Sequence, residues 1–104
     1  MTDHHEKMYA VCGKVVIRRI GSDTLLVPVS GPAAGGRVFP VNESALTVWN
    51  GLLDGGTVRS AADALVEQYG IEREQALADS RECAERFAGE ELLETCGKTE
   101  RLKS

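Results

Sequence analysis

The spacing of apolar residues changes once along the chain, near residue 42, from short strand-like runs to a helical period. Before that point, residues 15–20 and 24–29 are rich in β-branched and aliphatic side chains, which favour strands. Gly21-Ser22-Asp23 lies between these runs, and a three-residue loop with a glycine is typical of a hairpin. We therefore expect two antiparallel strands.

A third strand is expected at residues 37–41, after a loop at residues 30–36 that is rich in glycine and turn-forming residues. The strand contains Pro40, which has no backbone N–H and is tolerated mainly at sheet edges or bulges. Pro40 therefore predicts that residues 37–41 form an edge of the sheet. The direction of its missing N–H stays open: it faces either the neighbouring strand or the free side, where an added strand would lose one hydrogen bond.

Three helices are expected after the change of period. Asn42 can cap the first helix, whose apolar residues fall at i, i+3, i+4, i+7 and i+8, and Gly55-Gly56 ends it. Thr57 can cap the second helix, which has the clearest apolar stripe and stops at Gly70. The third begins near Glu72 and has a weaker stripe. Core positions expected from this spacing include Trp49, Leu52, Leu65 and Phe87.

Three short strands cannot bury a sheet face by themselves, so the apolar stripes of the helices must cover one face. The sequence thus predicts an α+β, winged-helix-like fold with a three-stranded antiparallel sheet followed by three helices. A chain of 104 residues suits one domain. We expect this domain at residues 15–93, between a flexible N-terminal tail, residues 1–14, and a polar C-terminal tail, residues 94–104.

Charge and hydropathy narrow the range of partners. The chain has 16 acidic and 12 basic residues and a net charge of −4, which disfavours nucleic acid because a phosphate backbone would be repelled. No apolar run approaches the roughly 20 residues that span a bilayer, and the N-terminal segment has no apolar signal core. We therefore expect a cytoplasmic protein that does not enter a membrane.

Candidate chemistry is sparse. The two histidines, His4 and His5, lie in the polar N-terminal segment, where neither can be fixed beside a serine or cysteine nucleophile; we regard copper or nickel binding there as accidental. The cysteines, Cys12, Cys83 and Cys96, lack Cys-x-x-Cys spacing and are expected to be free thiols. The glycines match no nucleotide-binding motif. The sequence predicts no enzyme, no metal site and no cofactor.

The order of features between residues 41 and 93 is more informative than any single motif. It consists of Val41-Asn42-Glu43-Ser44-Ala45 leading to Trp49 and Leu52-Leu53-Asp54-Gly55, then Thr57-Val58 opening a helix that ends at Tyr69-Gly70, then Asp79 in a third helix followed by Leu92-Leu93. This order resembles the PqqD family of small peptide chaperones, also called recognition elements for ribosomally made, modified peptides (RiPPs). The resemblance covers about residues 15–93. The sequence departs from the family at Pro40, and at Cys83 and Ala84, where larger apolar residues are usual.

The resemblance implies a non-catalytic domain that binds the leader of a precursor peptide and hands it to a modifying enzyme, often a radical S-adenosylmethionine (radical SAM) enzyme. The leader would add as a strand on residues 37–41, with its side chains entering a groove against the third helix. The candidate peptide-binding residues are Arg37, Val38, Phe39, Pro40 and Val41 on the strand, and Arg73, Leu77, Ser80, Arg81 and Ala84 on the helix. Arg73 and Arg81 would attract acidic leader residues, and Ala84 would widen the groove.

Two other classes of function remain open at this stage. A winged-helix DNA-binding regulator would fit the helix-rich half, although acidic residues dominate its third helix. A structural subunit would show no affinity for peptides. The expected oligomeric state is a monomer or a weak dimer, since a free strand edge can pair with a second copy.

Overall fold

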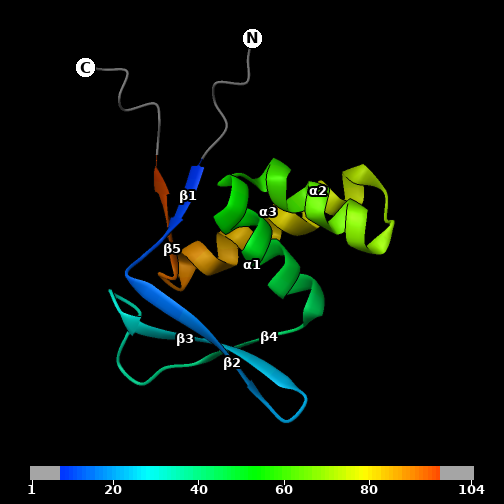
Figure 1. The fold of residues 1–104 in the computed structure, drawn as a ribbon. Coiled ribbons are helices and arrows are strands. Elements are labelled where there is room, and N and C mark those ends of the chain that lie inside the picture. Colours follow the sequence, from blue (N-terminus) through cyan, green and yellow to red (C-terminus); the bar gives the residue numbers. More distant parts are fainter. Residues whose placement is uncertain (1–7, 97–104) are drawn as a thin grey trace, which may run out of the picture.

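The computed structural model describes residues 8–96, which fold into strands and helices in two layers (Figure 1). In chain order the elements are β1 (Met8–Val11), β2 (Lys14–Ile20), β3 (Asp23–Ser30), β4 (Phe39–Val41), α1 (Glu43–Gly55), α2 (Val58–Tyr69), α3 (Arg73–Gly89) and β5 (Leu93–Cys96). Strands β2, β3 and β4 form an antiparallel sheet in that order, and β1 pairs with β5. The expected α+β fold, a three-stranded sheet with three helices, is confirmed; "winged helix" describes it loosely.

The hairpin between β2 and β3 is one residue tighter than expected. Ile20 pairs with Asp23, so the turn consists of Gly21-Ser22 alone. Gly21 has a φ of 63°, and two-residue hairpin turns of this kind need a positive φ, which glycine adopts at little cost. The turn therefore fixes the register of the hairpin.

One face of the sheet packs toward the helices. Thr24, Leu26 and Pro28 alternate along β3 and are buried, as expected when every second side chain points to the same face. Pro28 lies in the central strand, opposite a register shift between Lys14 and Val15. A bulge is one of the few places where a strand accommodates proline.

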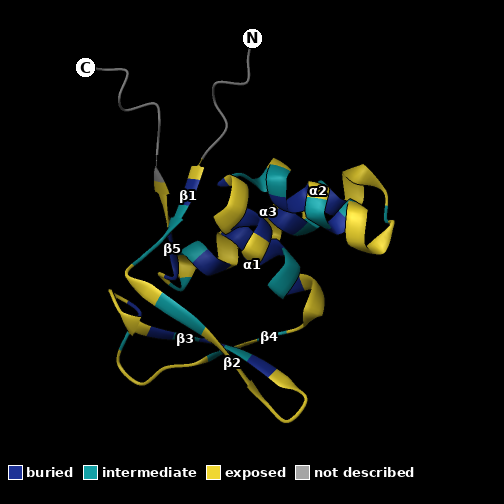
Figure 2. Cartoon of the chain, viewed as in Figure 1, coloured by how far each residue is buried: buried dark blue, intermediate teal, exposed yellow. Residues whose placement is uncertain are grey.

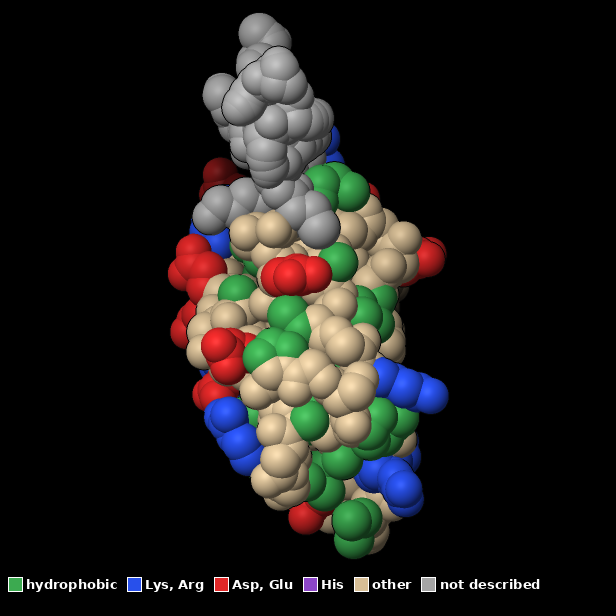
Figure 3. All heavy atoms as spheres, turned by 90° about the vertical axis from the view of Figure 1, so that its left-hand side faces the viewer, with side chains coloured by type: hydrophobic (Ala, Val, Ile, Leu, Met, Phe, Trp, Pro, Cys, Tyr) green, Lys and Arg blue, Asp and Glu red, His purple; other side chains and the backbone are tan. Residues whose placement is uncertain are grey.

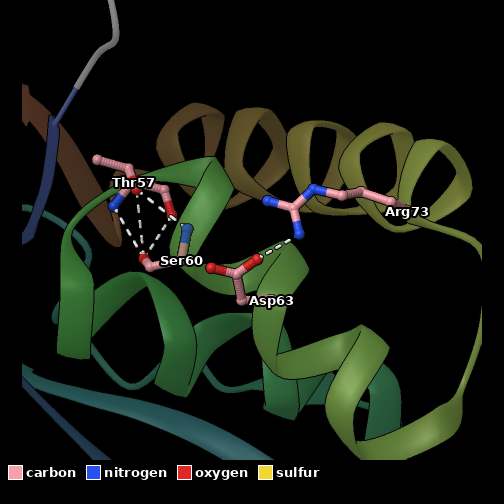
Figure 4. Close-up of polar contacts among 4 residues, drawn as sticks. All are labelled: Thr57, Ser60, Asp63 and Arg73. Atoms are coloured by element: carbon pink, nitrogen blue, oxygen red, sulfur yellow. Dashed lines mark hydrogen bonds and ion pairs between the residues drawn. The ribbon is translucent and has the colours of Figure 1, made fainter.

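The helix ends follow from their capping residues. The Asn42 side chain accepts a hydrogen bond of 2.8 Å from the Ala45 backbone N–H, which satisfies one free donor of the first turn of α1. Thr57 and Ser60 form a reciprocal capping box at the start of α2 (Figure 4). Asn42 and Thr57 were predicted as caps from the sequence and are confirmed.

The core lies between the three helices and the inner face of the sheet; Figure 2 colours the buried segments of the helices and of β3 dark blue. Trp49 of α1 contacts Phe87 of α3 edge-to-face, with ring centroids 5.1 Å apart and an interplanar angle of 83°. The predicted core residues Trp49, Leu52, Leu65 and Phe87 are all buried. None of the described helices is long and apolar enough to cross a membrane.

Strands β1 and β5 were not predicted. Residues 8–11 were expected in a flexible tail and residues 94–96 in a polar one, but they pair along four residues each. Tyr9 is only 8% exposed, and its backbone N–H donates to the Gly56 carbonyl at 2.7 Å. This second pair of strands thereby attaches both ends of the described chain to the helices.

Candidate functional site

The free edge of β4 is the first component of the candidate site. No strand lies on its outer side among residues 8–96, since the sheet order ends at β4. The strand is shorter than expected: it comprises Phe39–Val41, whereas Arg37 and Val38 belong to the preceding loop. Gly35 and Gly36 in that loop have φ values of 133° and 88°, which lie outside strand geometry.

The ladder register determines which way Pro40 faces. Pro40 pairs with Leu25, and because proline has no N–H this cannot be a pair that exchanges two hydrogen bonds. The bonded pairs must then be its neighbours, Thr24–Val41 and Leu26–Phe39. The backbone nitrogen and carbonyl of Pro40 therefore point to the free edge, which offers an acceptor there but no donor.

The side chains of Phe39 and Val41 point to the face of the sheet opposite that of the Pro40 side chain, toward α3. They share the inner face of the sheet with their buried partners Leu26 and Thr24. Together with the last turns of α3 they enclose a pocket of about 180 Å³, which we call the apolar pocket. It is lined by Phe39, Pro40, Val41, Arg86, Phe87, Glu90 and Leu92.

A second, more open pocket continues from the first toward the tip of the hairpin. We call it the polar pocket; its volume is about 500 Å³. It is lined by Arg19, Ser22, Asp23, Thr24, Pro40, Val41, Asn42, Glu43 and Arg86. Pro40, Val41 and Arg86 line both pockets, so the two form one continuous groove along β4.

An ion pair crosses one end of this groove. The Arg37 guanidinium lies 3.2 Å from a carboxylate oxygen of Glu90, and both side chains are about half exposed, at 52% and 43%. The same guanidinium lies over the Phe39 ring, 5.0 Å from its centroid, a favourable cation–π geometry. Arg37 thus connects the start of β4 to the end of α3.

The structure brings only part of the predicted residue set to this groove. Phe39, Pro40 and Val41 line it, and Arg37 spans its end. Val38 is exposed beside it. The five residues predicted on α3 do not line either pocket: Arg73, Leu77, Ser80, Arg81 and Ala84.

The physical reason is the orientation of α3. Its first half packs on α2, where Arg73 pairs with Asp63 at 2.6 Å (Figure 4), and only its last turns reach β4. Ser80 and Ala84 are fully buried because they share the core face of the helix with Phe87. The prediction chose the right helix, but the residues at the end of α3 that line the groove are Arg86, Phe87 and Glu90. A role of the five predicted residues in peptide binding stays a prediction.

Sequence reasoning missed Arg86, Glu90, Leu92 and Arg19. Arg86 lies in the last turn of α3 and Glu90 directly follows the helix, four residues further on and adjacent to the apolar stripe. That spacing was a usable signal. The contact between Arg37 and Glu90 joins residues 53 positions apart in the sequence, and no local pattern predicts it.

The described cysteines are not activated for chemistry. Cys12 and Cys83 are free thiols, as predicted. Burial raises the pKa of both thiols, although Arg86 opposes the shift of the Cys83 pKa. Both thiols are therefore protonated at neutral pH. Because the thiolate is the nucleophilic form, neither thiol is activated for attack. His4, His5 and the side chain of Cys96 lie outside the described residues.

Residues 8–96 contain no cluster of three or more histidine, cysteine, aspartate or glutamate side chains that could hold a metal ion. The site therefore consists of an open strand edge, an apolar pocket, a polar pocket and the arginines around them. Such an arrangement can bind an extended peptide through backbone hydrogen bonds and alternate side chains.

Comparison with known proteins gives a family and a fold. The family described as coenzyme PQQ synthesis protein D (PqqD) matches residues 23–93. The solved structure of TbiB1 in complex with the TbiA(beta) leader peptide is 24% identical, with a TM-score of 0.65 over 82% of this chain and 94% of that chain. Lasso peptide synthetase B1 complexed with the leader peptide is 17% identical, with a TM-score of 0.67 over 84% of this chain and 98% of that chain. No curated protein matches.

Proposed function

The chain belongs to the PqqD family, and from this we propose that it binds the leader of a ribosomally made precursor peptide by strand addition to β4. The observation that carries the proposal is the open edge of β4 beside the two pockets. Main-chain hydrogen bonds would provide affinity, and side chains entering the groove would provide specificity. The two solved structures that share the fold hold leader peptides, which supports leader binding as the function.

The proposed role is that of a chaperone without catalytic machinery of its own. It would present the bound leader to a modifying enzyme, and we propose a radical SAM enzyme as that partner because the family resemblance implies one. The shared fold with a lasso peptide synthetase component makes a lasso peptide synthetase the alternative partner. The proposed location is the cytoplasm, where ribosomes make the precursor. The proposed peptide-recognition domain is residues 15–93, against which β1 and the rest of β5 pack.

The DNA-binding alternative has no support from the family or from the fold comparisons. On the face shown in Figure 3, acidic side chains are most numerous in the upper part and basic ones in the lower part, with hydrophobic side chains between them. A phosphate backbone would bind a continuous basic surface. The described surface in this view is mixed instead.

The test is an NMR titration of isotope-labelled protein with leader peptides from small reading frames encoded beside its gene. We expect backbone amide shifts in residues 38–42 and 86–92, which border the groove. Residues 14–17 of β2 provide an internal control, because they lie on the other edge of the same sheet and line neither pocket, so their amides should not shift. Shifts confined to β2, or no shifts with any of the leader peptides, would contradict the proposal.

The partner enzyme requires a separate experiment. Tagged protein loaded with a binding leader peptide is mixed with each candidate enzyme encoded nearby, and the bound enzyme is identified. Retention of a radical SAM enzyme would support the assignment made above. Retention of a lasso peptide synthetase instead would replace it.

A further inference from the structure

The apolar pocket and the polar pocket lie side by side along β4, about as far apart as two alternate residues of a strand. Phe39 lines only the apolar pocket, whereas Val41, two residues further along β4, also lines the polar pocket. On a strand added to β4, side chains on the inner face recur every second residue. A guest side chain opposite Phe39 would enter the apolar pocket, and the one opposite Val41 would lie at the polar pocket.

The apolar pocket suits one hydrophobic guest side chain. Its floor is formed by Phe87 and Leu92, which are 3% and 1% exposed and belong to the core. A volume of about 180 Å³ is of the size that an aliphatic or aromatic side chain fills. Removing such a side chain from water is favourable.

Arg86 marks the point where the two pockets meet. Its side chain is exposed and lines both pockets. Among residues 8–96 no carboxylate lies within ion-pair distance of it, in contrast to Arg37 and Arg73, which are paired. An unpaired guanidinium has five N–H donors and favours a carboxylate.

The remaining charges of the polar pocket also allow a guest carboxylate. Arg19 is a second cation of this pocket, and Asp23 and Glu43 are its acidic residues. Glu43 lies in the first turn of α1, where the helix dipole offsets its charge. Among the charged residues that line the polar pocket, only Arg86 also lines the apolar pocket.

Given the proposed function, we infer that the preferred guest segment carries an aspartate or glutamate two residues before a hydrophobic residue. The order follows from direction: we take the guest as antiparallel to β4, as are both strand pairs of this sheet, and such a guest passes Val41 before it passes Phe39. The acidic side chain pairs with Arg86, the hydrophobic side chain enters the apolar pocket, and the residue between them points away with Pro40.

The experiment is a selection from a display library of random peptides of about 12 residues on the immobilised full-length protein. We expect the enriched peptides to share the order acidic, any residue, hydrophobic. An exposed charge pair is worth up to about 1 kcal/mol, so the acidic residue should improve affinity about two- to fivefold over glutamine in resynthesised peptides.

Two variants separate the role of Arg86 from general charge effects. Arg86→Glu should replace the acidic preference with a basic one. Arg18→Glu changes the net charge equally at an exposed position of β2 that lines neither pocket, and it should leave the preference unchanged. Circular dichroism of each variant confirms that the fold is retained.

The outcomes distinguish this inference from the proposed function. Enriched peptides that bind at β4 without an acidic preference, with the reverse order, or with a preference that Arg86→Glu does not alter would overturn the inference and leave strand addition standing. Failure to enrich any peptide would overturn the proposed function, and the inference with it.

Discussion

Ser80 is the one buried side chain of the described core whose hydroxyl has no hydrogen-bond partner. It is fully buried in α3, where an unsatisfied hydroxyl costs free energy and alanine has the higher helix propensity. We predict that Ser80→Ala raises the free energy of unfolding by about 1 kcal/mol. Urea denaturation followed by circular dichroism measures the change.

Ala78→Ser is the matched control for this substitution, because Ala78 is exposed on the same helix. It measures the propensity difference between serine and alanine without burial, which is a few tenths of a kcal/mol. If Ser80→Ala gains no more than Ala78→Ser loses, the buried hydroxyl is not a source of instability.

At the level of single residues, the sequence predicted what depends on local geometry. Asn42 and Thr57 were identified as caps because a cap needs only its own side chain and the next turn. Ser80 and Ala84, predicted for the wall of the groove, are instead fully buried, because the helical period places them on the same face as Phe87. Which of two adjacent faces meets β4 depends on how α3 is oriented, and that is a tertiary property.

The free edge of β4 lacks one hydrogen-bond donor, because the Pro40 nitrogen points to that edge and carries no hydrogen. We predict that Pro40→Val restores one donor and tightens binding of a leader peptide about two- to tenfold, the effect of one net hydrogen bond. The same change should promote pairing of β4 with a second copy, since proline on an edge strand opposes such pairing. Isothermal titration calorimetry and sedimentation velocity measure the two effects.

Pro32→Val is the control for the proline itself, because Pro32 is exposed in the loop before β4. It removes the same restriction from the unfolded chain without changing the edge. Equal affinities of the Pro40→Val variant and the wild-type protein would show that the guest makes no backbone bond at this position.

Helices α1 and α2 cross closely at Gly51. A Cβ atom on Gly51 would lie 2.7 Å from the Ala61 Cα, a backbone contact that cannot yield by a change of rotamer. We predict that Gly51→Ala lowers the free energy of unfolding by about 1–3 kcal/mol, despite the better helix propensity of alanine. Thermal and urea denaturation measure the loss.

Gly89→Ala separates propensity from packing at this crossing. Gly89 is the last residue of α3, and a Cβ there would have no atom within 4 Å. This variant should be neutral or stabilised by up to about 1 kcal/mol. Stabilisation of both variants would show that α1 and α2 separate freely enough to accept the extra methyl group.

The whole molecule contains a connection that the sequence did not reveal. Strands β1 and β5 are four residues each and lack a clear alternation of apolar and polar residues, so neither has a signal of its own. They form because the two ends of the domain meet: the Cys12 N–H donates to the Leu92 carbonyl at 2.9 Å. Pairing between distant segments depends on the finished fold, whereas the hairpin and the helices are specified locally.

The contribution of β1 and β5 decides where the folded unit begins and ends. A fragment of residues 15–93 would lose all of β1 and most of β5. Leu92 and Leu93 would remain but become uncovered. In the intact structure they are only 1% and 2% exposed. The fragment would also lose the buried Tyr9 ring, and deleting a buried aromatic side chain costs about 3–5 kcal/mol. We predict that its free energy of unfolding is at least about 3 kcal/mol below that of a fragment of residues 8–96. Urea denaturation of the two fragments side by side measures the difference. Equal free energies of unfolding would show that residues 15–93 fold as a self-sufficient domain, to whose stability β1 and β5 contribute nothing.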